Sequence, residues 1–439
     1  MRGSRAAALI AVAAVLAGCG STGGSPDGGA TTSGENGPGV SAESVKVGFV
    51  TLKKATAAGG SFTTADPGDI TRQVAALVEH VNATGGVAGR TLEPVVVEYD
   101  AATASPATEN QLCTKLTQDE GVFAVVLIGQ REQSSRECYR KARTLMIDAG
   151  GVALAQSVYE GLAPYLFAPS TSTLDTVAAN LVPTLDAAGF FEGDVTVGVV
   201  QEKDPQYAEV NEKVLTPALA SIGIDQVELA EIDQTDGGTA GATAGAGVLA
   251  FKQAGVDRVL FLGRPDNVGY WASLSAPQQY TPRLALTSFD SPEFAAANPA
   301  FHPPAQMAGA QGLGFIPSRD GVGATEPFPS AGEQACLDIF ATKGETFAAR
   351  ANANRALNYC DAVLFLQAAT ASIGKDAVLN ADAVAAGAVA LGTSWQAAST
   401  FATTFGESVY APAGAGRPLE YVGPAFTYTG PVTPFAGSE

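Results

Sequence analysis

One stretch of the chain, residues 45–100, constrains the fold most. Two short β-branched runs, VKVGFV (45–50) and PVVVEY (94–99), flank a segment with helical periodicity, ITRQVAALVEHVN (70–82). One face of this segment carries five apolar residues, namely Ile70, Val74, Leu77, Val78 and Val81. The two flanking runs are typical of strands that are covered on both faces. The stretch therefore predicts a strand–helix–strand unit in a parallel sheet with right-handed crossovers.

The same alternation continues to about residue 290 and predicts an α/β fold class. Further strand-like runs occur at 122–128, 144–147, 165–170, 195–200, 227–232, 258–263 and 283–287. A Gly/Ala-rich run at 237–247 is predicted to begin a helix only in its latter half. After QGLGFI (311–316) the pattern changes to a loop and two or three helices, and LEYVGPAFTYTG (419–430) predicts a final strand or pair. We therefore expect two doubly wound parallel-sheet lobes that the chain connects more than once.

The N-terminus has the pattern of an export signal. Two arginines precede an apolar run at 6–17, and Leu-Ala-Gly-Cys then ends at Cys19. This ending resembles the bacterial lipobox, in which a peptidase cuts before the Cys and its thiol is acylated. The apolar run is shorter than the roughly 20 residues needed to span a bilayer. We expect a lipoprotein signal peptide at 1–18 and, from the Gly/Ser/Thr-rich composition, a flexible tether at 19–44.

Composition argues against several classes of function. The 439 residues carry a formal charge of −19, whereas binding to nucleic acid or to an anionic membrane needs clustered Lys and Arg. The chain has two histidines, His80 and His302, and no GxSxG, P-loop or HExxH motif. Acid–base chemistry would have to depend on carboxylates alone. We therefore expect no enzyme, no cofactor and no metal site.

Four cysteines follow Cys19, and an even number in an exported chain favours disulfides. Their spacing favours the local pairs Cys113–Cys138 and Cys336–Cys360, although four cysteines allow three pairings. Each pair would close a loop of about 25 residues and contribute roughly 3 kcal/mol in the chain-entropy model. The first pair lies on consecutive predicted helices that flank one strand, so its bridge would join the two helices.

The opening stretch also resembles a known family. VNATGGVAGRTLEPVVVEYD (81–100) and VFAVVLIG (122–129) are similar to the type I periplasmic binding proteins, in particular to the branched-chain amino-acid-type solute-binding proteins of ABC importers. The most specific signature consists here of Asn82, Gly85, Gly86, Val87, Gly89, Arg90 and Asp100. We interpret its Gly-Gly turn as scaffold. The turn precedes its strand, whereas doubly wound sheets bind ligands beyond the carboxyl ends of their strands.

The resemblance covers residues 45 to about 430 and implies two lobes that close on a solute about a three-strand hinge. Placed on this chain, the lobes comprise 45–167 with 318–417 and 168–317 with 418–430, and a tail follows at 431–439. The implied protein is a monomer that binds a small polar solute and an ABC permease. Only its lipid would hold it to the extracytoplasmic face of the membrane. The alternative is a sensory lipoprotein that presents its closed form to a receptor kinase, because one fold serves both roles.

Loops at the carboxyl ends of the predicted strands are where such a protein would bind its solute. The candidate ligand-binding residues on these loops are Ser61, Phe62, Gln130, Gln133, Ser134, Asp148, Gly150, Tyr207, Arg264 and Asp290. Amino-acid-binding relatives hold the ligand carboxylate with hydroxyl groups and backbone amides, and the ammonium with an acid of the second lobe. Ser134 and Ser135 match the first requirement by position, and Asp290 matches the second.

The loop after 144–147 departs from that pattern. It reads Asp148-Ala149-Gly150-Gly151 and has no hydroxyl side chain. An Asp beside a ligand carboxylate would repel it. Either Asp148 points away from the solute, or the solute is not a plain α-amino acid. We therefore favour a solute with amide, hydroxyl or cationic groups.

The lipobox makes a direct prediction about Cys19. Changing Cys19 to Ser should abolish lipid attachment, because the hydroxyl replaces the thiol that would be acylated. Cells grown with an alkynyl fatty acid should label the wild-type chain and a Cys113→Ser control, but not C19S. Equal labelling of all three chains would contradict the lipoprotein interpretation.

Overall fold

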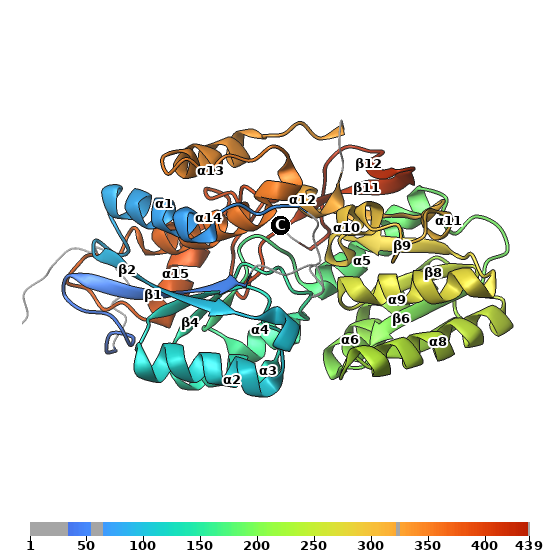
Figure 1. Ribbon diagram of the computed structural model, residues 1–439, viewed down its shortest axis with the longest axis horizontal. Coiled ribbons are helices and arrows are strands. Elements are labelled where there is room, and N and C mark those ends of the chain that lie inside the picture. Colours follow the sequence, from blue (N-terminus) through green and yellow to red (C-terminus); the bar gives the residue numbers. More distant parts are fainter. Residues whose placement is uncertain (1–33, 54–64, 322–324, 438–439) are drawn as a thin grey trace, which may run out of the picture. The chain divides into compact units, whose positions relative to one another are not determined.

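Two sheets organise the chain (Figure 1). The computed structural model describes residues 34–53, 65–321 and 325–437, so the predicted signal peptide and Cys19 lie outside the described residues. The first sheet has the strand order β2-β1-β3-β4-β5 and is parallel throughout. The second has the order β12-β11-β10-β9-β8-β6-β7, with β13 paired to β11, and becomes antiparallel only at β11, β12 and β13. The predicted α/β class with two doubly wound sheets is confirmed.

The first sheet contains the predicted opening unit. Its strands are β1 (Ser44–Leu52), β2 (Thr91–Tyr99), β3 (Ala124–Leu127), β4 (Leu145–Asp148) and β5 (Leu166–Phe167). Its connecting helices are α1 (Ile70–Ala83), α2 (Pro106–Thr114) with a π-helical turn at Lys115–Asp119, α3 (Gln133–Lys141) and α4 (Gln156–Leu162). The Asp69 carboxylate caps α1 by accepting from the backbone amides of Thr71 and Arg72, which satisfies donors that the helix leaves free.

One expectation for this unit is wrong. We predicted that β2 is covered on both faces, but it is an edge strand with alternating exposed and buried side chains. Val96 is 43% exposed, whereas Leu92 and Tyr99 are buried. Pro94, which cannot donate to a ladder, is tolerated in an edge strand because only one side of that strand must pair. The run of three valines therefore reports β propensity and not burial.

The Gly-Gly turn between α1 and β2 is scaffold in the structure. Gly86 and Gly89 both have a φ of +72°, which favours glycine, and Gly86 donates to the Val81 carbonyl at the end of α1. Arg90 is buried and donates to the carbonyls of Ser41 and Ala377. The turn thus ties together three distant parts of the chain at the amino ends of the strands.

The second sheet carries the second αβ series. Its strands are β6 (Val197–Glu202), β7 (Val227–Ile232), β8 (Arg258–Leu262), β9 (Arg283–Thr287) and β10 (Gln311–Gly314). Its helices are α5 (Leu174–Ala187), α6 (Pro205–Val210), α7 (Thr216–Ser221), α8 (Gly237–Ala254), α9 (Pro265–Ser275), α10 (Pro292–Ala297) and α11 (Pro304–Met307). Helices α5 to α7 share one core with the sheet, and α8 and α9 share another.

Helix α8 begins earlier than we predicted. The sequence indicated a start in the latter half of residues 237–247, but the helix begins at Gly237. The Asp236 carboxylate accepts from the amides of Gly238 and Thr239, and this cap compensates for the weak helix propensity of the glycines. The glycines also allow close packing, since Gly247 lies against Ala230 and Trp271.

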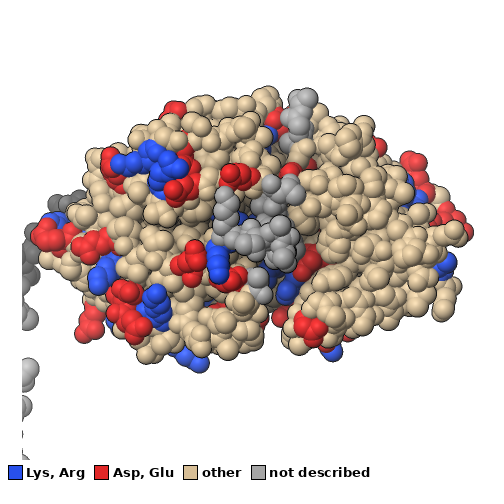
Figure 2. All heavy atoms as spheres, in the orientation of Figure 1, with Lys and Arg blue, Asp and Glu red and all other residues tan. Residues whose placement is uncertain are grey.

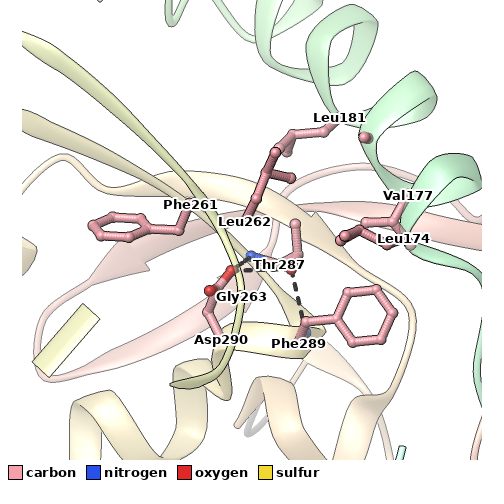
Figure 3. A pocket seen from close by; sticks show the side chains of 10 residues that line it. Leu174, Val177, Leu181, Phe261, Leu262, Gly263, Thr287, Phe289 and Asp290 are labelled. Carbon is pink, nitrogen blue, oxygen red and sulfur yellow. Dashed lines mark hydrogen bonds between the residues drawn. The ribbon is translucent and has the colours of Figure 1, made fainter. Parts of the chain in front are cut away.

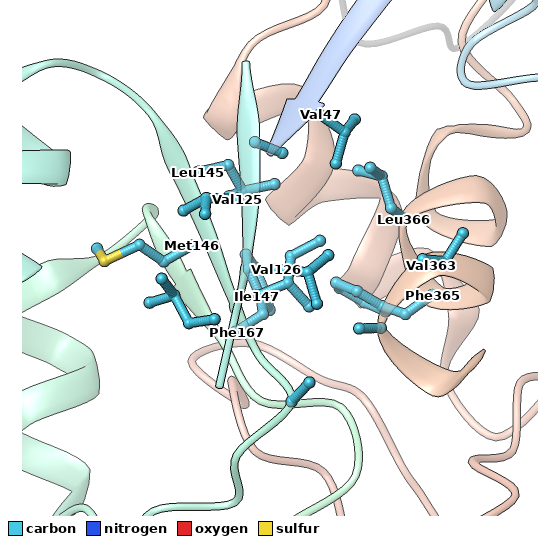
Figure 4. Packing of buried hydrophobic residues seen from close by; sticks show 14 of the residues in the cluster. Val47, Val125, Val126, Leu145, Met146, Ile147, Phe167, Val363, Phe365 and Leu366 are labelled. Carbon is cyan, nitrogen blue, oxygen red and sulfur yellow. The ribbon is translucent and has the colours of Figure 1, made fainter. Parts of the chain in front are cut away.

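After the second sheet the chain returns to the first. Helix α12 (Pro317–Asp320), in a segment predicted to be a loop, follows β10 directly, and then come α13 (Ala331–Ala341), α14 (Arg350–Thr370) and α15 (Ala381–Leu391). Figure 4 shows Val363, Phe365 and Leu366 of α14 packed against the first sheet, and these helices share its core. The chain then enters β11 (Ala415–Val422), β12 (Ala425–Tyr428) and β13 (Thr433–Pro434) of the second sheet.

We refer to each sheet with the helices packed on it as a lobe. The chain passes between the lobes at three places, namely after β5, after β10 and before β11. The first and third passages are hydrogen-bonded to each other, because Ala168 donates to the Tyr410 carbonyl and Ala413 donates to the Thr171 carbonyl. The exact lobe bounds given above stay predictions.

Both predicted disulfides are present, Cys113–Cys138 and Cys336–Cys360. The first joins α2 to α3, and the second joins α13 to α14. Each bridge therefore connects two helices that cover one face of the first sheet.

The predicted tether extends too far. Residues 34–43 were assigned to it by composition, but part of this segment is bound to the first lobe. Gly37 donates to the Leu379 carbonyl, and the Asn36 side chain accepts from the Leu379 amide. A glycine-rich composition describes the free chain, and it does not reveal that these backbone groups find partners near α15.

Helix α15 approaches α14 so closely that a Cβ at Gly387 would overlap the Ala369 carbonyl oxygen. Changing Gly387 to Ala should lower the free energy of unfolding by about 1–3 kcal/mol, because the two helices must separate. Gly161 on α4 is the matched control, since a Cβ there meets no atom within 4 Å. G161A should change the free energy by less than about 1 kcal/mol. Urea unfolding followed by circular dichroism measures both variants, and equal losses would contradict the close approach.

Candidate functional site

Loops from the carboxyl ends of both sheets meet between the lobes. The Tyr207 hydroxyl, at the start of α6, donates to the Ala153 carbonyl over 3.2 Å. The Gln206 side chain accepts from the Ala155 amide over 3.1 Å. Figure 2 shows acidic and basic side chains of both lobes around the junction between them. We call this region, formed by residues 128–136, 148–155, 201–207 and 263–267 with α12, the interlobe site.

A buried carboxylate shapes the loop after β4. Asp148 Oδ1 accepts from the amides of Gly150 (2.6 Å) and Gly151 (3.1 Å). Its Oδ2 lies 3.8 Å from Nη2 of the buried Arg136. Burial raises the pKa of Asp148, although Arg136 and the two amides favour the charged form. The Asp148 carboxylate is thus bound within its own turn. This agrees with the alternative that Asp148 points away from the solute.

Arg319 of α12 holds the same turn from the other side. Its guanidinium donates to the Gly151 carbonyl over 2.9 Å and to the Gly150 carbonyl. Burial lowers the pKa of Arg319 to about 10, and Asp148 opposes this shift. Since α12 follows the second passage between the lobes, this contact fixes that passage to the first sheet. Arg319 was not among the predicted site residues, because its segment was predicted to be a loop.

Glu109 supports the loop after β3. Its carboxylate accepts from the amides of Arg131 (2.9 Å) and Glu132 (2.9 Å) and from the Ser135 hydroxyl (3.0 Å). The Tyr99 hydroxyl donates to it as well, over 3.1 Å. Glu109 could have been found from the sequence as an acid on the buried face of α2, beside Leu112 and Cys113. A buried acid of this kind usually has several partners, and here they orient Arg131 and Glu132.

Charges from the two lobes act on one another. Arg264 and Glu202 form a two-point ion pair within the second lobe, with Nε–Oε2 and Nη2–Oε1 distances of 3.0 and 2.5 Å. Glu132 belongs to the first lobe. Burial and Glu109 raise its pKa, whereas Arg264 lowers it. Burial raises the pKa of Tyr207, so its hydroxyl stays protonated as the donor to Ala153.

The other predicted residues have different environments. Gln130 is buried beside the Tyr139 hydroxyl. Gln133 and Ser134 begin α3 and are exposed, and Ser134 accepts from the Asn110 side chain over 2.9 Å. Ser61 and Phe62 lie outside the described residues. The structure thus brings Asp148, Gly150, Tyr207 and Arg264 into one region, and their role in binding stays a prediction.

Asp290 is enclosed by its own turn, and it lines one small cavity together with Gly263 of the interlobe site (Figure 3). It is 2% exposed and accepts from the amide (2.7 Å) and the hydroxyl (3.0 Å) of Thr287. The cavity beside it, which Leu174, Val177 and Phe289 also line, holds about 10 Å³. That volume suits one water molecule and no solute. Burial raises the pKa of Asp290 to about 7, although both Thr287 groups favour the charged form.

Two further properties concern the described part of the chain. No group of three or more His, Cys, Asp and Glu residues within it is arranged to bind a metal ion. No helix in the described ranges has both the length and the apolar composition of a membrane span.

The arrangement of two sheets with three passages between them is found in known structures. A fatty acid ABC transporter substrate-binding protein from Thermomonospora curvata is 18% identical, with a TM-score of 0.63, and the match covers 92% of this chain and 95% of that one. A solute-binding protein from R. palustris in complex with benzoate is 17% identical, with a TM-score of 0.61 and coverage of 90% and 98%. The chain has the type I periplasmic binding protein fold.

A third protein of the type I fold is the branched-chain amino acid binding protein LivJ of Streptococcus pneumoniae, in complex with isoleucine. It is 15% identical, with a TM-score of 0.59, and the match covers 89% of this chain and all of that one. No protein-family model and no curated protein sequence matches the chain. At these identities the comparisons establish the type I fold, and the solute must be inferred from the site.

The raised pKa of Asp290 predicts a pH dependence of stability. Between the ordinary Asp pKa near 4 and about 7, the unfolded chain releases this proton and the folded chain keeps it, so stability falls as pH rises. Changing Asp290 to Asn removes this contribution, which has a slope of up to about 1.4 kcal/mol per pH unit. Urea unfolding at pH 5 and pH 7 should therefore show a smaller loss for D290N than for the wild type. Equal losses would show that Asp290 is charged in the folded chain.

Proposed function

We propose that this chain is the extracytoplasmic solute-binding lipoprotein of an ABC importer. In this role it captures a small solute at the interlobe site and delivers the solute to a permease. One observation carries the proposal: loops from the carboxyl ends of both parallel sheets meet at one place. Ligands of doubly wound sheets bind at such ends.

The contacts between the lobes support a closing movement. Apart from the three chain passages, the loops are joined here by polar contacts, such as Tyr207 to Ala153 and Gln206 to Ala155, and by the small side chains of Ala153 and Ala155, which pack in the apolar core of the second lobe. Polar contacts of this kind exchange with water at a small net cost in free energy. A solute that binds both lobes would therefore shift the population toward the closed form.

The compared proteins of the same fold support a transport role. Two of them belong to ABC transporters, one for fatty acid and one in complex with benzoate, and the third is a branched-chain amino acid transporter substrate-binding protein in complex with isoleucine. We extend to this chain only the role of a solute-binding subunit. The lipid anchor at Cys19, the monomeric state and the permease partner are parts of the same proposal. The lobe bounds, 45–167 with 318–417 and 168–317 with 418–430, are proposed with it.

A thermal-shift screen tests the proposal. The chain without residues 1–19 is heated with a panel of amino acids, organic acids, amides, sugars and polyamines. A ligand at 100 times its dissociation constant should stabilise the folded chain by about 2.7 kcal/mol, because it binds only that state. For a compound that binds, uptake by cells that lack the gene should fall and should return with the wild-type gene.

Two results would contradict parts of the proposal. If no compound class raises the melting temperature, solute capture is contradicted. If a compound binds but its uptake does not depend on the gene, the importer role is contradicted, and a sensory role becomes the better explanation.

A further inference from the structure

Arg355 of α14 carries a charge that no described residue compensates. In the described part of the chain, burial lowers the pKa of three arginines, Arg283, Arg319 and Arg355. Arg283 donates to the Gly309 carbonyl over 3.3 Å, and Arg319 donates to two carbonyls of the first lobe. Arg355 is partly buried and has no hydrogen bond, ion pair or ring contact with any described residue. A desolvated guanidinium without an acceptor is costly to the ligand-free protein.

Helix α14 places Arg355 at the carboxyl edge of the first sheet. The Tyr359 hydroxyl donates to the Val50 carbonyl near the end of β1 (2.6 Å), and Gln367 donates to Thr84 at the end of α1 (2.9 Å). The helix therefore runs from the carboxyl edge of the sheet toward its amino edge. Arg355 precedes Tyr359 by one turn on the same helix face, so it lies about 5–6 Å further toward the carboxyl edge.

The contacts of α12 bring the start of α14 to the interlobe site. Ser318 donates to the Asn354 side chain over 2.7 Å. Arg319, the next residue of α12, donates to the Gly150 and Gly151 carbonyls of the interlobe site. Arg355 follows Asn354 directly, so its charge is at the level of the loops that leave the first sheet.

Arg131 is a second cation on the carboxyl side of the first sheet. It follows β3, which is the neighbour of β1 in the first sheet. Its guanidinium has no hydrogen bond or ion pair within the described ranges, and its charge lowers the pKa of both Arg319 and Tyr207. The nearby acids Glu202 and Asp148 already have partners, which are Arg264 and the loop after β4. Arg355 and Arg131 thus have no ion-pair partner among the described residues, in a chain whose net charge is −19.

We propose that the solute carries an anionic group, such as a carboxylate, and that Arg355 binds it. This inference rests on the proposed function. The planar guanidinium forms two parallel hydrogen bonds with a carboxylate, and a partly buried site strengthens such a pair. A ligand carboxylate was disfavoured because Asp148 would repel it. In the structure the Asp148 carboxylate is bound within its own turn, so this objection no longer applies. The solute thus completes an ion pair that the chain leaves open.

The first measurement separates binding from a structural role. Arg355→Gln keeps a polar stem and removes the charge. Because the ligand-free chain offers this charge no partner, the variant should melt at the same temperature as the wild type or higher. A fall of more than about 5 °C would assign Arg355 to the fold and would overturn the proposal.

The second measurement uses acids and their amides as matched probes. Benzoate is compared with benzamide, octanoate with octanamide and isoleucine with isoleucinamide, by isothermal titration at constant ionic strength. At least one acid should bind the wild type about tenfold or more tightly than its amide. R355Q should weaken this acid by about tenfold or more and leave the amide within about twofold, while R355K retains part of the affinity. Arg140→Gln on α3, which removes an equal charge from the Glu137 pair, is the control and should bind as the wild type does.

The outcomes separate the two proposals. If the acid and its amide bind equally, or if R355Q and R140Q behave alike, the anion site at Arg355 is wrong and solute capture stands. If a neutral or cationic compound of the thermal-shift screen binds and no acid does, the anion site at Arg355 is likewise wrong and solute capture stands. If no compound of any class binds the wild type, the proposed function fails, and this inference fails with it.

Discussion

The buried carboxylate of Asp148 is the interaction on which the interlobe site depends. It holds the amides of Gly150 and Gly151, while Arg319 holds the carbonyls of the same two residues. Both polar edges of the turn are thus fixed, one by the first sheet and the other by the helix that follows β10. The loop then reaches Ala153 and Ala155, which contact the second lobe. Without this network the lobes would have no defined meeting point on this side.

The regular elements were predictable where local patterns match burial. The run at 283–287 coincides with β9 as observed, because a short apolar run between polar turns matches a buried parallel strand. The run at 227–232 coincides with β7, although β7 is an edge strand in which Leu229 is 52% exposed. Prediction failed where tertiary contacts decide. The valines of β2 lie on an edge, and residues near Asn36 bind close to α15. None of these contacts is encoded in the neighbouring sequence.

The site was predictable only as a set of loops. The rule that ligands bind at carboxyl strand ends selected the segments of Asp148, Tyr207 and Arg264. It could not show that Arg264 is paired with Glu202 or that Asp290 is enclosed by its own turn. Arg355 was not considered, because it follows β1 by about 300 residues and approaches the sheet only through the contacts of α14 with β1 and α12. Charge compensation is a property of the folded chain, so a sequence scan finds candidates and cannot rank them.

The return of α14 to the first sheet has a consequence for biosynthesis. Its residues complete the core that includes Val47, Val126 and Ile147, yet the whole second-lobe series from β6 to β10 lies between them in the chain. An N-terminal fragment that ends before Arg350 would expose a bare apolar sheet surface to water. The first lobe cannot mature during synthesis, and the nascent chain must be kept from aggregating until most of it has been made. A chain organised in this way is suited to export in an unfolded state, because its earliest segments gain little stability before its last helices arrive.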